Sequence, residues 1–230
     1  MYKKSKDLAF LIGVSMCDGS TTIKLDKKKG NRYRFQLGSV DKEFVDKTAD
    51  ILEKNGLHCT RHVYETSKRK ETWNDMNFLT VSNKDFVLWI RDETEHKTKI
   101  PSWIKLRKEY EINFVNGVLS SDGWVGKTRQ GNGYKYSVGL GMTDNWVYEV
   151  NDILRKYGVD VKKENKRILK SGKLFHWFQF NLISFINSPF KFSIKRKDNR
   201  LKEYLKTRVT QDSSYYSSIG LKGAKARWSK

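Results

Sequence analysis

One short pattern occurs twice in this chain of 230 residues. Residues 10–19 and 114–123 place Phe, Gly, Val, Asp and Gly in the same slots. Each copy predicts an apolar helix that ends at Asp-Gly, with a glycine and a second small residue four positions apart. Helices of this kind can pack with their backbones unusually close, because no large side chain separates them. The repeat therefore predicts two similar halves joined at a central pair of helices.

The small residues of the two copies define the expected contact surface of the helix pair. They are Gly13, Cys17, Gly117 and Ser121. The glycines that close the pattern, Gly19 and Gly123, are expected to end the helices in the left-handed conformation that glycine adopts readily.

Asp18 and Asp122 occupy the same slot in the two copies. If the helices pack side by side, both carboxylates lie at a helix C-terminus, where the helix dipole is already negative. Two carboxylates are unfavourable there unless a cation binds between them. One copy alone would more simply be a helix end, but the repetition favours a metal-binding site with paired acids on a pseudo-twofold axis.

Composition restricts the class of partner. Lys and Arg number 46 against 26 Asp and Glu, and the net charge of +20 predicts a polyanionic partner, most simply nucleic acid. A highly soluble basic protein is the alternative. An anionic membrane is a weaker option, because no long basic amphipathic helix appears. A membrane span is not expected either, because no apolar run approaches the roughly 20 residues that it needs. Two cysteines, Cys17 and Cys59, form neither a disulfide framework nor a zinc-site spacing, so we expect an intracellular, reducing compartment such as cytoplasm, nucleoid or organelle matrix.

The segments after each motif repeat as well. Polar and apolar residues alternate with period two, which is typical of strands with one buried and one exposed face. A later helix carries Asp-Ile-Leu at residues 50–52 and again at 152–154, followed four residues on by Gly56 and Gly158. Each half is therefore predicted as helix, two strands, helix, two strands, helix (αββαββα), and the fold class as α+β with antiparallel sheets.

The predicted domain boundaries follow from this repeat. They give an N-terminal half at 1–95, a linker at 96–102, a C-terminal half at 103–205 and a basic tail at 206–230. Residues 127–133 are expected to form a loop after the second motif.

The polar faces of the predicted strands are candidates for reading DNA. A two-stranded ribbon fits the major groove, where Arg pairs with guanine and Gln with adenine. For any one residue a solvated charge is an equally good interpretation, but the set as a whole favours a binding surface. Because the halves differ in these residues, the target should be asymmetric. The candidates are Lys24, Arg32, Arg34 and Gln36 in the first half, and Lys127, Arg129 and Lys135 in the second.

Residues 11–19 and 115–123 resemble the nine-residue motif of the LAGLIDADG homing endonucleases, in the single-chain form with two motifs. The resemblance implies a monomer whose two sheets form a saddle on double-stranded DNA and which cuts both strands across the minor groove, leaving short 3′ overhangs. It implies that the metal is held by Asp18 and Asp122 and by the backbone carbonyls of Cys17 and Ser121. The expected cofactor is Mg²⁺, with Mn²⁺ as a substitute and Ca²⁺ supporting binding without cleavage.

In that family a polar residue near the end of the second strand and a lysine near the fourth strand often order water. Ser39 is the candidate for the polar residue, whereas Gly141 and Met142 offer nothing polar at that place in the second half. Lys84 and Lys127 are the nearest basic candidates, although a phosphate contact or a solvated surface position is the better interpretation of each.

Two rival functions remain open at this point. One is a maturase that binds intron RNA and assists splicing, and the other is a non-cleaving DNA-binding regulator, although the segment after Lys206 is short for the added domain that such regulators carry.

Overall fold

The computed structural model describes residues 2–25, 30–66, 68, 74–130, 133–162 and 164–207. The predicted basic tail lies outside this part of the chain except for residues 206 and 207. Those two belong to a helix that includes residues 195–207, so the expected boundary after residue 205 falls inside a helix.

Both halves have the predicted order of elements. A short 3-10 helix, η1 (Ser102–Leu106), joins them. The first half consists of α1 (Lys6–Met16), β1 (Ser20–Lys24), β2 (Arg32–Ser39), α2 (Lys42–Lys54), β3 (Thr60–Tyr64), β4 (Met76–Val81) and α3 (Lys84–Glu93). The second consists of α4 (Lys108–Ser121), β5 (Gly123–Gln130), β6 (Gly133–Met142), α5 (Val147–Lys156), β7 (Asn165–Ile168), β8 (Leu174–Phe180) and α6 (Leu182–Ile186).

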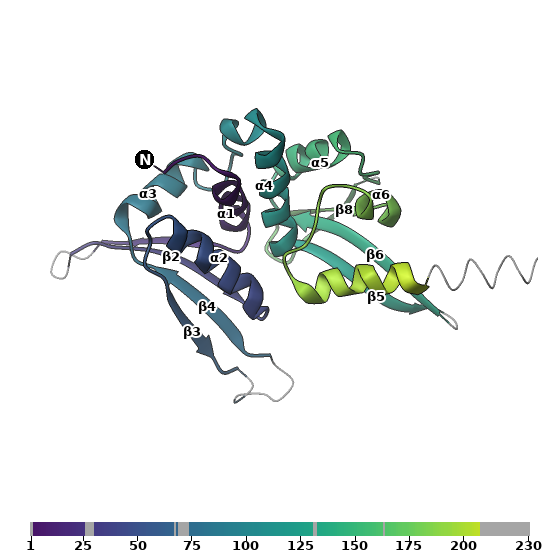
Figure 1. Cartoon of the computed structure of the whole chain (residues 1–230), viewed down its shortest axis with the longest axis horizontal. Helices are drawn as coiled ribbons and strands as arrows, with labels where there is room; N and C mark the ends of the chain where they lie inside the picture. The colour runs from purple at the N-terminus through teal and green to yellow at the C-terminus, as the bar shows by residue number, and fades with distance from the viewer. Residues whose placement is uncertain are drawn as a thin grey trace, which may run out of the picture.

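The strands form two antiparallel sheets with the same topology. Their orders are β1-β2-β4-β3 and β5-β6-β8-β7. In Figure 1, α1 and α4 lie at the centre with one sheet on each side of them. The fold is therefore α+β with two pseudo-symmetric halves, as predicted. None of the helices in the described residues is long and apolar enough to cross a membrane.

The central helix pair packs through its glycines, as the repeat predicts. A Cβ atom added at Gly13 would lie 2.2 Å from the carbonyl oxygen of Phe114, and one at Gly117 would lie 2.3 Å from that of Phe10. Each glycine thus faces the backbone of the opposite helix in a reciprocal contact. All residues of α1 from Leu8 to Met16 are buried, which explains why this helix is apolar on every side.

Gly19 and Gly123 follow the motif helices, but the prediction that they adopt the left-handed conformation is wrong. Neither has a positive φ; the described glycines that do are Gly30, Gly56, Gly158 and Gly172. A Cβ atom at Gly19 would instead lie 2.7 Å from the Cα of Ser15, and one at Gly123 would lie 2.5 Å from the carbonyl oxygen of Leu119. Glycine is required because the chain turns back tightly against the last turn of the helix that it has just left.

The helices that carry the repeated Asp-Ile-Leu sequence end at a glycine, as predicted. Gly56 and Gly158 have φ values of +78° and +84°. Each closes a Schellman motif, in which the next amide, of Leu57 or Val159, donates to a carbonyl oxygen of the last helical turn at 3.1 Å. The left-handed conformation that the sequence suggested for the motif glycines is found here instead.

Candidate active site and nucleic-acid interface

The two motif acids lie at the same end of the helix pair. Asp18 follows the last turn of α1, and Asp122 is the C-cap residue of α4. The thiol of Cys17 in the first motif hydrogen-bonds to the carboxylate of Asp122 in the second. The structure therefore brings together the residues that the repeat predicted as a paired site.

Burial makes both acids harder to ionise, and the charge of Asp18 adds to the effect on Asp122. Burial raises the pKa of Asp122 to about 6, and the neighbouring charge of Asp18 acts in the same direction. Burial also raises the pKa of Asp18, while the charges of Lys197 and Lys97 oppose that rise. A bound cation would relieve both effects, because it replaces lost solvation and cancels the repulsion.

Two lysines that the sequence analysis missed stand beside these acids. The Nζ of Lys97 donates to the carbonyl oxygens of Cys17, at 3.0 Å, and Gly19. The Nζ of Lys197 donates to the three carbonyl oxygens that end α4, with the shortest contact, 2.7 Å, to Ser120. Each ammonium group thus caps the negative end of one motif helix.

The two lysines are themselves perturbed by their surroundings. Burial lowers the pKa of Lys197 to about 8, and the nearby charge of Arg196 acts in the same direction. Burial also lowers the pKa of Lys97, whereas the surrounding acids raise it. Ammonium groups with a lowered pKa can give up a proton more readily near neutral pH than ordinary lysines can.

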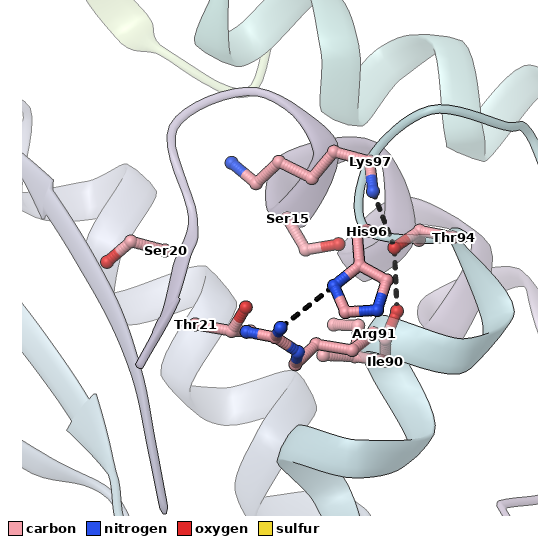
Figure 2. A pocket seen from close by; sticks show the side chains of 8 residues that line it. All are labelled: Ser15, Ser20, Thr21, Ile90, Arg91, Thr94, His96 and Lys97. Atoms are coloured by element: carbon pink, nitrogen blue, oxygen red, sulfur yellow. Dashed lines mark hydrogen bonds between the residues drawn. The ribbon is translucent and has the colours of Figure 1, made fainter. Parts of the chain in front are cut away.

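Lys97 is presented by an unusual stretch of backbone (Figure 2). Glu95, His96 and Lys97 have φ values of 42°, 59° and 74°, a left-handed run that costs roughly 1–2 kcal/mol per residue without glycine. The buried hydroxyl of Thr94 accepts a hydrogen bond from the Lys97 amide at 3.2 Å and donates one to the Ile90 carbonyl at 2.8 Å. This turn spans the boundary between the predicted N-terminal half and the predicted linker, and Lys97 itself lies in the linker, which therefore supplies part of the site. Strain of this kind is typical of functional positions.

No local pattern marks these lysines. They follow their motif acids by 79 and 75 residues, after the last strand pair of each half, and this similar spacing is the signal that could have indicated them. The residues predicted for auxiliary roles have other contacts: Ser39 Oγ accepts from the Asp41 amide at 3.1 Å, and Lys84 lies 5.9 Å from the ring centre of Tyr33.

The donor atoms at the acid pair fit a hard divalent cation. Asp18 and Asp122 supply carboxylate oxygens, and the carbonyls of Cys17 and Ser121 each retain a second lone pair beside the lysine hydrogen bond. The Oγ of Ser121 is buried without a hydrogen-bond partner, which leaves a further oxygen free. Among the described residues, no group of three His, Cys, Asp or Glu side chains could hold a metal. The remaining ligands would have to be carbonyl, water or substrate oxygens.

The first sheet presents its predicted polar residues on one face. Lys24 lies opposite Arg32, Thr22 opposite Arg34, and residues directly opposite share a face. These four residues and Gln36 line a depression of about 190 Å³. Of the alternate residues of β2, Phe35 and Leu37 are buried in the core and Tyr33 is partly buried against it. The period-two prediction for this strand therefore gave the correct face.

The prediction for the second sheet is partly wrong. Residues 127–130 belong to β5 and are not a loop, because they pair with β6 as far as Gln130 opposite Gly133. Lys127 lies opposite the buried Tyr136, so it points to the helix side of the sheet. Its Nζ hydrogen-bonds to Glu203 in the helix at 195–207.

Arg129 and Lys135 lie on different faces of the second sheet. Arg129 is opposite Tyr134 and shares the side of Lys127, whereas Lys135 is opposite Thr128 on the open side. Of the three residues predicted here, only Lys135 therefore shares the face that corresponds to the first sheet's polar depression.

Comparison with known proteins agrees with this geometry. Residues 5–94 match the family model described as a LAGLIDADG-like domain. An uncharacterized protein of Methanocaldococcus jannaschii is 27% identical over 218 residues, which cover 88% of this chain and 73% of the relative.

Solved structures share the fold at low sequence identity. The LAGLIDADG homing endonuclease I-GzeII in complex with its DNA target has a TM-score of 0.58 at 12% identity, covering 96% of both chains. I-DmoI in complex with DNA and Mn has a TM-score of 0.54 at 14% identity, covering 81% of this chain and 97% of its own. The resemblance seen in the two motifs is thus confirmed: residues 5–94 form a LAGLIDADG-like domain, and the chain has the two-half fold of the LAGLIDADG homing endonucleases.

Proposed function

We propose that this protein is a site-specific endonuclease that hydrolyses one phosphodiester bond in each strand of a double-stranded DNA target and leaves 3′ overhangs. The observation that carries the proposal is the pair of acids, Asp18 and Asp122, at the foot of the central helices, with a lysine beside each. The structures of I-DmoI and I-GzeII, which share this fold and are complexes with DNA, support double-stranded DNA as the partner.

Asp18 and Asp122 would hold divalent metal, with Mg²⁺ the proposed ion, and the carbonyls of Cys17 and Ser121 would complete the protein's share of the ligands. When bound, the metal supplies activation of water and stabilisation of the leaving oxygen. The chain's own contribution is to place both carboxylates on one axis, so that each strand meets one half of the site.

Lys97 and Lys197 hold the ends of the motif helices and place a positive charge next to each acid. In the proposed reaction they orient water and offset the negative charge that develops on the phosphate. Their lowered pKa values favour exchange of a proton with water near neutral pH.

One chain contains both acids and both sheets, so we propose that it acts as a monomer. Its two cysteines, Cys17 and Cys59, are free thiols, which suits a reducing intracellular compartment. Mobility of an intron or intein is the proposed biological context.

The test combines binding and cleavage on the same DNA. A randomised duplex library is first selected for binding in Ca²⁺, and the selected duplex is then incubated with Mg²⁺ and wild-type protein, Asp18→Asn or Asp122→Asn. We expect both variants to bind and to lose cleavage. Asp152→Asn is the matched control, because this side chain is 75% exposed and its ion pair, with Arg155, lies on the same helix, α5.

If either Asp18→Asn or Asp122→Asn cleaves the duplex at the wild-type rate, that acid does not have the proposed role in holding the metal for cleavage. A wild type that binds the selected duplex and never cuts it in Mg²⁺ or Mn²⁺ would overturn the nuclease proposal and favour the maturase or regulator alternatives. Binding of intron RNA in preference to the selected duplex would favour the maturase.

A further inference from the structure

The open faces of the two sheets can be compared pair by pair, because the halves share one register. The acids stand two residues before Ser20 and Trp124, which begin the open faces of β1 and β5. Three successive cross-strand pairs then correspond. In the first sheet they are Ser20–Gln36, Thr22–Arg34 and Lys24–Arg32, and in the second Trp124–Gly139, Gly126–Ser137 and Thr128–Lys135.

The corresponding pairs carry different chemistry. The first sheet presents an amide and two guanidinium groups from β2, all long side chains with donors at their tips. At the same places on β6 the second sheet has Gly139, Ser137 and Lys135. In the second sheet only the outermost of the three pairs, Thr128–Lys135, contains a cationic side chain. Along β5 and β6 the floor of the second sheet is therefore low and poor in donors, and the amide that faces Gly139 comes from Gln179 of β8.

Aromatic rings cover this floor instead. A Cβ atom at Gly139 would lie 2.4 Å from the indole of Trp124, and one at Gly141 would lie 2.7 Å from the ring of Phe175, so both rings lie across glycine backbone. Trp177 is opposite Gly141 on the same face. All three aromatic side chains are partly exposed.

One charged group lies against this aromatic surface. The guanidinium of Arg167 lies 5.1 Å from the ring centre of Phe175, in a cation–π contact. In the first sheet Phe78 covers Gly38 in a similar way, and His62 stacks on it at 5.2 Å. Phe78 and Phe175 thus each have a neighbouring side chain against the ring, whereas the partly exposed indoles of Trp124 and Trp177 are added by the second half. The broad, open aromatic surface belongs to the second half.

From these observations, and resting on the proposed function, we infer that the two halves read their half-sites by different chemistry. The first sheet reads guanine through hydrogen bonds from Arg34 and Arg32. The second sheet reads thymine through contact of its C5-methyl group with the aromatic surface of Trp124, Phe175 and Trp177. Arg pairs with the O6 and N7 atoms of guanine, and apolar side chains recognise the thymine methyl group, so each surface matches a different base pair.

The closing experiment uses the duplex selected in Ca²⁺. We expect G·C pairs to dominate one half-site and A·T pairs the other. Thymines are then replaced by deoxyuracil, which lacks only the methyl group, in one half-site at a time. Wild-type affinity should fall about fourfold for each contacted methyl group that is removed from the A·T half-site, and change less than about twofold when the other half-site is substituted.

Two variants link each preference to its sheet. Arg34→Ala should reduce discrimination at one G·C position about tenfold or more. The double variant Gly126→Thr with Ser137→Arg copies the Thr22–Arg34 pair into the second sheet, and it should create a guanine preference at the mirrored position of the A·T half-site. Because the deoxyuracil test uses the wild-type protein, it decides the question even if a variant fails to fold.

The outcomes separate the two proposals. If no duplex is enriched, the proposed function fails and the inference fails with it. If a duplex is enriched and cut, but both half-sites are equally rich in G·C or deoxyuracil has no effect in either, the inference is overturned and the proposed function stands.

Discussion

Replacing Gly117 with alanine tests the contact on which both halves depend. The added Cβ would lie 2.3 Å from the carbonyl oxygen of Phe10 and 3.1 Å from the amide nitrogen of Val14. A carbon and a carbonyl oxygen ordinarily approach no closer than about 3.3 Å, so the helices must separate by about 1 Å. Both obstructing atoms are backbone, which cannot rotate away. Movement would also loosen the reciprocal contact at Gly13.

The magnitude follows from two opposing effects. Overpacking of this kind costs about 1–3 kcal/mol, and the enforced backbone shift puts this site at the upper end. Alanine gains about 1 kcal/mol over glycine from helix propensity. The expected net loss in the free energy of unfolding is therefore about 2 kcal/mol for Gly117→Ala, and several kcal/mol for Gly117→Leu.

Urea unfolding followed by circular dichroism measures this loss. Gly133→Ala is the matched control, because an added Cβ there has no atom within 4 Å and the backbone has no positive φ. The control should change stability by less than about 1 kcal/mol. An unchanged or higher unfolding midpoint for Gly117→Ala would refute the close approach of the motif helices, because helix propensity alone would then determine whether the free energy of unfolding rises or falls.

The remaining predictions concern the site and its supports. Because the pKa of Asp122 is raised to about 6, protonation should abolish metal binding as pH falls through that value. Single-turnover cleavage at limiting Mg²⁺ should therefore decline below about pH 6. A constant rate down to about pH 5 would contradict this prediction. Lys97→Met and Lys197→Met should each slow cleavage about 100-fold or more while target affinity stays within a few-fold, and full cleavage by either would make that lysine purely structural. The guanidinium group of Arg196 donates bidentate hydrogen bonds of 2.8–3.1 Å to the carboxylate of the buried Asp41 in the other half. Arg196→Met should therefore destabilise the protein by about 1–3 kcal/mol, partly recovered by adding Asp41→Asn, and additive losses would show that the pair does not interact. Target affinity measured against salt concentration should fall steeply, and a flat dependence would exclude extensive phosphate contact.

The sequence by itself determined the repeat, the fold class and the paired acids. These depend on local requirements: Gly13 and Gly117 must be glycine for two backbones to touch, and a carboxylate follows each helix at the same place. The face of β2 was equally predictable, because Tyr33, Phe35 and Leu37 fix the phase of the polar residues between them.

The tertiary structure decided the face of β5. Residues 127–130 are all polar, so no apolar neighbour within this stretch fixes their phase, and the sequence suggested a loop. Pairing with β6 places Lys127 beside Tyr136 on the helix side, where Glu203 binds it. The glycines after the motifs were misread for a similar reason: their requirement comes from neighbouring atoms and not from their own φ.

The roles of the two site lysines were also decided by tertiary structure, since only their similar spacing from the motif acids marks them in the sequence. Lys97 and Lys197 are two among 46 basic residues, and nothing in their local sequence separates them from solvated charges. A left-handed turn in the linker and the start of a helix near residue 195 bring them to the carbonyls at the ends of α1 and α4. Each lysine caps a helix that lies more than 70 residues earlier in the chain, so the contact depends on the tertiary fold. Its partners are backbone carbonyls, which are the same for every residue type and leave no signal in the sequence.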